Sequence, residues 1–202
     1  MFYAPEHRDR HLLPHDPFKA LIAPRPIGWV STKSKSGALN LAPYSFFNAV
    51  ADHPPIVMLS SQGWKDSATF ANETREFVWN MATYDLRESM NLSSANLPRG
   101  ESEFAYTGLE TAPSRFVAPP RVAQSPAALE CKVIDILLLK DLDGALTGNV
   151  LVFGQVVGVY VDDAFIKEGR VDTSAMRPIA RCGYMDYAVT DELFEMPRPR
   201  RV

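Results

Sequence analysis

The sequence predicts a mainly β protein with added helices, an α+β chain whose strands curl into a small β-barrel. Apolar and β-branched runs that suit strands occur toward both ends of the chain, with helical or looped sequence between them. Strands and helices do not alternate regularly, which argues against a doubly wound dinucleotide-binding fold. Two glycines inside the longest predicted strand, Gly154 and Gly158, allow the bends that curl a sheet toward closure.

Length and composition fit one folded unit with a small-molecule partner. The 202 residues are 46% hydrophobic, enough to bury a core as one domain or as one domain with an attached subdomain. The formal net charge of -3 gives no basic excess for binding a nucleic acid or an anionic membrane. No signal-peptide pattern and no bilayer-length apolar run is visible, so we expect a soluble cytoplasmic protein in a reducing compartment.

Cysteine and histidine positions predict no metal site. Cys131 and Cys182 lie far apart without CxxC spacing, and we expect both to be buried free thiols. His7, His11 and His15 have helical spacing, but neighbouring prolines interrupt any helix and no carboxylate completes a ligand set.

The first third of the chain predicts a hairpin followed by a buried strand. Residues 26–32 are rich in bulky and β-branched side chains, and a turn around Gly37 leads into the next ordered segment, which is typical of a hairpin. Residues 56–59 form a short, continuous apolar run, which suits a strand buried on both faces. We expect that strand to end abruptly at Ser60 and Ser61.

A short helix and a polar insertion follow. Asp66 or Ser67 can cap a helix that runs to about Thr74, and residues 77–81 return to strand. Residues 84–116 are polar and predict helices or loops, which we interpret as an insertion packed on the sheet.

The last third predicts a long antiparallel hairpin and a loose tail. Residues 129–133 alternate apolar and charged side chains, as in a half-buried strand. Residues 141–149 form a glycine-containing turn into a strand over 150–161. Residues 196–202 carry no core side chains after Met196, so we expect a flexible arm or a contact with a partner subunit.

Polar residues between the buried strand and the helix predict a phosphate site. Ser60, Ser61 and Lys65 supply hydroxyls and a positive charge, and the helix beginning near Asp66 and Ser67 supplies free amides. A dianionic phosphate needs such donors, and a glycine-rich loop is not required. The alternative interpretation is that the serines end a strand, Asp66 caps a helix and Lys65 is solvated.

Several separate blocks of sequence resemble one known family. The blocks are PRPIGWVST, NLAPYSFFNAV, HPPIVMLSS, KDSATFANETREFVWN, LVFGQVVGVYVDDAFIKEGRVD and RPIARCGYMDYA. In order and spacing they resemble the flavin reductase-like family, which includes component B of nitrilotriacetate monooxygenase. The resemblance covers most of the chain and implies an FMN-binding split β-barrel over residues 1–202 as a single domain, usually a homodimer with the flavin close to the subunit interface.

The resemblance also implies which residues bind the cofactor. The residues that would line the flavin ring and the ribityl chain are Asn40, Ala42, Pro43, Tyr44 and Ser45. Ser60 and Ser61 would reach the ribityl and phosphate groups. The residues that would complete the phosphate end are Lys65, Asp66 and Ser67, with Ser67 in place of the family's usual threonine. Ser31 and Thr32 are further candidates for ribityl or phosphate contacts, or they simply end the first strand.

The implied activity is hydride transfer from NADH or NADPH to FMN, held tightly or used as a substrate. The cofactor carries this chemistry, so no catalytic protein residue is expected. The reduced flavin would pass to a separate monooxygenase component, to oxygen or to another acceptor. Arg181, Gly183 and Tyr184 belong to a family block that approaches the active region.

Tyr160 departs from the family pattern and keeps two alternatives open. Relatives often carry histidine there, linked to handling of the nicotinamide, whereas a tyrosine would tune dinucleotide preference or simply pack in the strand. One alternative is a non-catalytic FMN-binding electron carrier. The other is a split-barrel oxidase or binding module that holds another ligand, such as pyridoxal phosphate or a deazaflavin.

Overall fold

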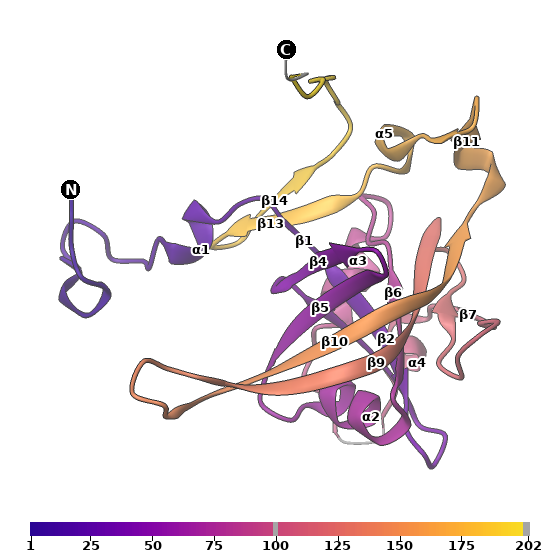
Figure 1. The fold of residues 1–202 in the computed structure, drawn as a ribbon, viewed down its shortest axis with the longest axis horizontal. Coiled ribbons are helices and arrows are strands. Elements are labelled where there is room, and N and C mark those ends of the chain that lie inside the picture. Colours follow the sequence, from indigo (N-terminus) through magenta and orange to yellow (C-terminus); the bar gives the residue numbers. More distant parts are fainter. Residues whose placement is uncertain (99–100, 200–202) are drawn as a thin grey trace.

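The computed structural model describes residues 1–98 and 101–199 and is built around a seven-stranded antiparallel sheet (Figure 1). The strand order is β3-β2-β6-β9-β10-β5-β4. The strands are β2 (Gly28–Lys33), β3 (Leu39–Tyr44), β4 (Phe47–Asp52), β5 (Pro55–Gln62), β6 (Glu76–Asn80), β9 (Ala127–Lys140) and β10 (Leu146–Val161). The predicted mainly β class and the N-terminal hairpin, formed by β2 and β3, are confirmed.

Shorter elements surround this sheet. The helices are α1 (Phe18–Leu21), α2 (Asp66–Thr74), α3 (Arg87–Leu92), α4 (Glu103–Thr107) and α5 (Thr173–Met176), with the 3-10 turns η1 (Pro5–His7) and η2 (Asp163–Phe165). A second sheet has the order β1-β13-β14, from β1 (Arg25–Pro26), β13 (Ile179–Gly183) and β14 (Asp186–Val189). Two-stranded ribbons pair β7 (Thr111–Ala112) with β8 (Arg121–Val122) and β11 (Ile166–Lys167) with β12 (Arg170–Val171). Within the described residues, no helix is long and apolar enough to cross a membrane.

Strand β2 is buried on both faces because it lies between two hydrophobic cores. On one face, Val30 packs in the barrel core together with Ala68 of α2. On the other face, Trp29 packs with Met90 of α3 and Phe104 of α4. The helices α3 and α4 of the described part of residues 84–116 therefore pack on the sheet.

The β9–β10 hairpin bends at the two glycines that the sequence singles out. Its register shifts next to Gly154 and next to Gly158. A Cβ atom at Gly154 would lie 2.4 Å from the ring of Phe77, and one at Gly158 would lie 2.6 Å from the ring of Phe116. Both glycines therefore leave room for an aromatic ring where the strand bends.

The burial predicted for the strand after the first hairpin was wrong. Strand β5 runs to Gln62, so Ser60 and Ser61 lie inside it and do not end it. Val57, Leu59 and Ser61 are buried, while Met58 and Ser60 between them are only partly buried. Neighbouring residues of a strand point to opposite faces, and only one face of β5 is covered within this chain.

The turn of the long hairpin is shorter than predicted. It closes between Asp141 and Ala145, whose backbone groups hydrogen-bond at 2.9 Å, and Gly144 supplies a positive φ within it. Strand β10 therefore begins at Leu146 instead of Val150. The extra residues extend the two-stranded arm that projects from the barrel (Figure 1).

Two side chains are buried differently from the prediction. Glu130 interrupts the expected alternation along β9 because its buried carboxylate accepts hydrogen bonds from the backbone N–H groups of Arg115 (2.9 Å) and Phe116 (2.6 Å). Both cysteines are free thiols, but only Cys131 is fully buried, whereas Cys182, near the end of the central strand β13 of the small sheet, is partly exposed.

The chain beyond β14 has no regular structure from residue 190 to residue 199. Its apolar side chains Leu193, Phe194 and Met196 are exposed. The predicted tail over 196–202 is thus exposed as far as residue 199, and residues 200–202 lie outside the described residues.

Replacing Gly154 by valine should destabilise the barrel, because the new side chain would collide with the fully buried ring of Phe77. We expect the free energy of unfolding, measured by urea denaturation, to fall by about 1 to 3 kcal/mol. Val159→Thr, at an exposed position of the same strand, is the control and should change it by less than about 0.5 kcal/mol. A Gly154→Val variant as stable as the wild type would contradict the packing role of this glycine.

Candidate functional site

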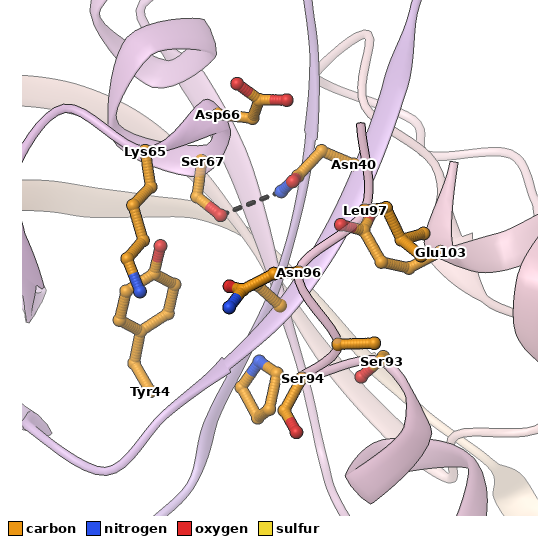
Figure 2. A pocket seen from close by; sticks show the side chains of 13 residues that line it. Asn40, Tyr44, Lys65, Asp66, Ser67, Ser93, Ser94, Asn96, Leu97 and Glu103 are labelled. Atoms are coloured by element: carbon orange, nitrogen blue, oxygen red, sulfur yellow. Dashed lines mark hydrogen bonds between the residues drawn. The ribbon is translucent and has the colours of Figure 1, made fainter. Parts of the chain in front are cut away.

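A polar cavity of about 370 Å³ lies between β3, the start of α2 and the segment that connects α3 to α4 (Figure 2). Its lining residues from β3 and α2 are Asn40, Ala42, Pro43, Tyr44, Lys65, Asp66 and Ser67. Its lining residues from the other wall are Ser93, Ser94, Ala95, Asn96, Leu97 and Glu103. The structure thus brings together the β3 and α2 residues that the sequence nominates, while Ser45 lies outside this lining. The opposite wall consists of residues that the sequence does not nominate.

Asn40 joins β3 to α2 at the floor of this cavity. Its side-chain amide donates to the hydroxyl oxygen of Ser67 at 2.7 Å, a bond drawn in Figure 2, and to that of Thr32 at 3.4 Å. All three side chains are buried. Because the Ser67 oxygen already accepts from Asn40, its O–H group is left to donate.

The start of α2 offers backbone donors to the cavity. Lys65 is the N-cap residue with an extended backbone, and its side chain makes no capping hydrogen bond. The prediction that Asp66 or Ser67 caps the helix was wrong, because both already have helical backbone geometry. The N–H groups of the first turn, together with the helix dipole, therefore favour an anion beside Lys65.

Tyr44 has a buried hydroxyl oxygen for which the described residues provide no hydrogen-bond partner. The hydroxyls of Ser67 and Ser61 are close by without forming such a bond. Burial raises the pKa of the Tyr44 hydroxyl above 10.0, and the two serines only partly offset this effect. The phenol therefore stays protonated at neutral pH, and its buried hydroxyl lacks the partner that such groups normally have.

Glu103 places a carboxylate in the opposite wall of the cavity (Figure 2). It begins α4, is only 8% exposed, and accepts a hydrogen bond from the backbone N–H of Leu41 at 2.9 Å. Burial raises the pKa of this carboxyl, and the bond from Leu41 partly lowers it again. This bond, together with the packing of Phe104 and Leu41 in one core, ties α4 to β3.

The connecting segment after α3 is the part of the site that the sequence interpretation missed. Ser93 accepts a hydrogen bond from the indole N–H of Trp29 at 2.9 Å, which fixes the segment on β2. Ser94 and Asn96 follow as lining residues. The polar run SSAN directly after a helical stretch was the available signal, but it fell within 84–116, where the sequence alone gave no role.

Ser31 and Thr32 lie behind the cavity, not on its lining. Ser31 is fully buried, donates to the carbonyl of Pro120 at 2.5 Å and accepts from the amide of Asn80 at 3.2 Å. Thr32 is also fully buried and is linked to the cavity through Asn40. Both residues support β2 and β3 from inside the protein.

The other predicted serines are distributed over three environments. Ser61 is buried and donates to the carbonyl of Gly63 at 2.9 Å. Ser60, its neighbour in β5, accepts from the amide of Asn149 at 3.2 Å. Adjacent strand residues face opposite ways, so these two hydroxyls do not converge on one ligand. Ser45 lines a second cavity.

This second cavity, of about 390 Å³, adjoins the first, because Pro43 and Ser94 line both. Arg181, Gly183 and Tyr184 also line it. The C-terminal block that the sequence links to the active region therefore lies next to the β3–α2 cavity.

Tyr160 lies in a third cavity of about 680 Å³. The guanidinium of Arg121 stacks over its ring at 3.7 Å. The described lining of this cavity shares no residue with that of the β3–α2 cavity, so Tyr160 is not part of that site within one chain.

The donor set of the β3–α2 cavity suits an organic anion. It combines an ammonium group, hydroxyls, side-chain amides and backbone N–H groups, opposed by two carboxylates. Across the part of the chain that the structure describes, no three His, Cys, Asp or Glu side chains are grouped to hold a metal ion.

The fold and this cavity define a split-barrel protein with a polar ligand site between a hairpin strand and a helix N-terminus. Residues 21–174 match the model of the flavin reductase like domain, and the chain belongs to this family. The family and the split β-barrel expected from the sequence are confirmed.

Similar proteins span nearly the whole chain. A protein from Halalkalibacterium halodurans is 38% identical over 183 residues, covering 88% of this chain and 87% of the relative. The crystal structure of nitrilotriacetate monooxygenase component B from Bacillus cereus has a TM-score of 0.86 at 30% identity, covering 97% of this chain and 98% of that chain. That of Pseudomonas fluorescens 2-nitrobenzoate 2-nitroreductase has a TM-score of 0.85 at 27% identity, covering 98% and 96%.

The burial of Glu103 predicts a pH-dependent stability difference between wild type and Glu103→Gln. A raised folded-state pKa means that the carboxyl stabilises the fold fully below its usual value of 4.5, and that this contribution is lost as pH rises through the raised pKa. Glutamine does not titrate and keeps an acceptor for the Leu41 N–H. Urea unfolding from about pH 4 to about pH 7 should therefore show the variant gaining stability relative to wild type.

The exposed residue Glu192 provides the control for this comparison. Glu192→Gln should show a difference from wild type that changes little across the same range. A Glu103→Gln difference that also stays constant would mean that the buried carboxyl does not titrate abnormally.

Proposed function

We propose that this protein binds FMN in the cavity between β3 and α2 and transfers hydride to it from NADH or NADPH. The observation that carries the proposal is the buried Tyr44 hydroxyl, which has no hydrogen-bond partner among the described residues and lies beside Lys65 and Ser67. A ligand with polar groups would satisfy it. Membership of the flavin reductase-like family supports flavin as that ligand.

The phosphate end of the cofactor fits the start of α2. The ammonium of Lys65, the N–H groups of the first helical turn and the O–H of Ser67 supply charged and neutral donors within one cavity. The carboxylates of Asp66 and Glu103 line the same cavity. They can accept hydrogen bonds from ribityl hydroxyls but would repel a dianion, so the phosphate belongs on the Lys65 side.

The remaining predicted contacts extend along β3. Asn40, Ala42 and Pro43 line the cavity together with Tyr44, and they provide a surface for the ribityl chain and the ring. Ser45 lies one step further, in the adjoining cavity. Ser31, Thr32 and the buried Ser61 would act behind these contacts through the packing of β2, β3 and β5, while Ser60 is held on the other face of its strand.

FMN held in this cavity would supply the redox chemistry, taking up a hydride and later releasing electrons. The protein's residues bind and orient it. Lys65 offsets the phosphate charge, and Tyr44 donates as a protonated phenol because burial raises its pKa. Hydride transfer needs no protein acid or base, so we assign no catalytic residue.

The electrons would leave through a separate protein or another acceptor. Similarity to component B of nitrilotriacetate monooxygenase supports a monooxygenase component as the recipient of reduced flavin. A non-catalytic FMN electron carrier is the second candidate function. It is favoured by Tyr160, which stands where relatives often carry histidine and stacks with Arg121 in a separate cavity.

We also propose that the chain, as one domain over residues 1–202, forms a homodimer. The β9–β10 arm projects from the barrel and exposes several apolar side chains (Figure 1). They are Ile134, Leu137, Leu138, Leu142 and Leu146. Apolar surface of this kind marks interaction sites, and a second copy would cover it.

An absorbance spectrum followed by anaerobic addition of NADH or NADPH tests the activity. We expect a flavin band after purification or after incubation with FMN, and bleaching of that band when the dinucleotide is added. A stable flavin band that neither dinucleotide bleaches would support the electron carrier instead. The absence of a flavin band, even after addition of FMN, would contradict both the reductase and the electron carrier.

Lys65→Ala tests the position of the phosphate. Loss of one charge-assisted contact costs about 1.5 to 3 kcal/mol, so the Kd for FMN should rise by about 10- to 150-fold. Riboflavin lacks the phosphate, and its Kd should change little. Lys132→Ala, at an exposed position outside the cavity lining, is the matched control. An unchanged Kd for FMN in Lys65→Ala would mean that the phosphate lies elsewhere.

A further inference from the structure

The second cavity, next to the proposed flavin site, is lined by three cations. They are Lys19 of α1, Arg25 of β1 and Arg181 of β13. No aspartate or glutamate is among its described lining residues. This is unlike the β3–α2 cavity, where Asp66 and Glu103 oppose Lys65. The second cavity therefore has the positive potential that an anionic ligand requires.

Two of these cations face each other across a strand pair. Arg25 and Arg181 are direct partners in the antiparallel pairing of β1 with β13. Like charges directly opposite each other in a sheet destabilise it. Within the described residues, neither arginine forms a salt bridge that would relieve this repulsion. A bound anion would turn the repulsion into a favourable interaction.

Arg25 is a buried cation with an unused donor. It is only 6% exposed, and one guanidinium nitrogen donates to the carbonyls of Lys19 and Ile22 at the end of α1. Its Nε is buried without a hydrogen-bond partner among the described residues. The hydrogen bonds to α1 explain the position of one nitrogen of this guanidinium. They explain neither the unpaired Nε nor why Arg181 lies directly opposite Arg25.

Arg181 is held in a fixed orientation within the same cavity. Its Nη2 donates to the carbonyl of Tyr184, and its guanidinium stacks over the ring of Tyr187 at 4.5 Å. Both tyrosines also line the cavity. A stacked guanidinium loses little freedom on binding, and its remaining N–H groups suit the oxygens of a phosphate.

Gly183 allows α1 to complete the cavity. Its φ is +111°, and a Cβ atom there would lie 2.6 Å from the Cα of Ala20. Only glycine permits this close approach of β13 to α1. The approach places α1, with Lys19, at the cavity that Arg25 and Arg181 line.

We propose that the second cavity is an anion subsite that holds the diphosphate of NADH or NADPH. This rests on the proposed function, because the dinucleotide must approach the flavin. Pro43 and Ser94 line both cavities, so a ligand anchored in one reaches the other. A volume of about 390 Å³ lies near the lower limit of small-molecule sites, so it suits part of a dinucleotide.

The phosphate of FMN is the other possible source of the anion. The two sources predict different responses to loss of Arg181. A dinucleotide subsite affects binding of a diphosphate probe and leaves FMN binding intact, whereas an FMN phosphate site affects FMN but not riboflavin.

Isothermal titration of the FMN-loaded protein with ADP, which carries the same diphosphate, tests the proposal. Arg181→Gln should weaken ADP binding by about 10-fold or more, as expected for loss of a charge-assisted contact. Arg181→Lys should keep part of it. Lys19→Gln, at an exposed position, should weaken it as well. Arg170→Gln, an exposed arginine outside this lining, is the control and should bind ADP like the wild type.

The outcomes separate this subsite from the proposed function. ADP binding by Arg181→Gln at wild-type strength, or no ADP binding by the wild type, would overturn the subsite. A weaker affinity for FMN together with unchanged ADP binding would overturn it in favour of the FMN phosphate. Flavin that neither dinucleotide reduces would overturn the proposed function, and Arg181-dependent ADP binding would then still support the anion subsite.

Discussion

The burial of β2 on both faces is the constraint on which the rest of the structure depends. Val30 packs into the barrel core and Trp29 into a second core under α3 and α4. Its edges are occupied by β3 and β6, so the strand is enclosed on all sides. Each of the two cores supports one wall of the β3–α2 cavity. Helix α2 packs in the barrel core, and the segment after α3 is held to the second core by the hydrogen bond from Trp29 to Ser93.

Some polar groups at this cavity have no hydrogen-bond partner among the described residues, although groups that serve only to stabilise a fold are normally paired. The Tyr44 hydroxyl is buried without a partner in the described chain, and the side chain of Lys65, the N-cap residue of α2, makes no capping hydrogen bond. Buried polar groups cost free energy unless they form hydrogen bonds. By contrast, Asn40, Ser67 and Thr32 just below are linked to one another. The unpaired groups therefore gather where a ligand can reach them.

The two adjoining cavities divide their charges differently. The first sets Lys65 against Asp66 and Glu103, which suits a ligand with both an anionic end and hydroxyl donors. The charged residues that line the second cavity within the described chain are all cations. One of them, Arg181 of β13, lies directly opposite Arg25 of β1. Residues from before β2 and from after α5 meet there, so this cavity exists only when both ends of the chain fold onto the barrel.

The sequence by itself determined the mainly β class, the two hairpins, the bends at Gly154 and Gly158, and the gathering of Tyr44 and Lys65 at one site. These features depend on local patterns and ordered motifs, which neighbouring residues encode. Only the tertiary structure decided that Glu103 and the segment after α3 form the opposite wall, and that Ser60 points away from Ser61. Those positions depend on packing between segments far apart in the chain, because burial and strand pairing choose the face that each side chain presents.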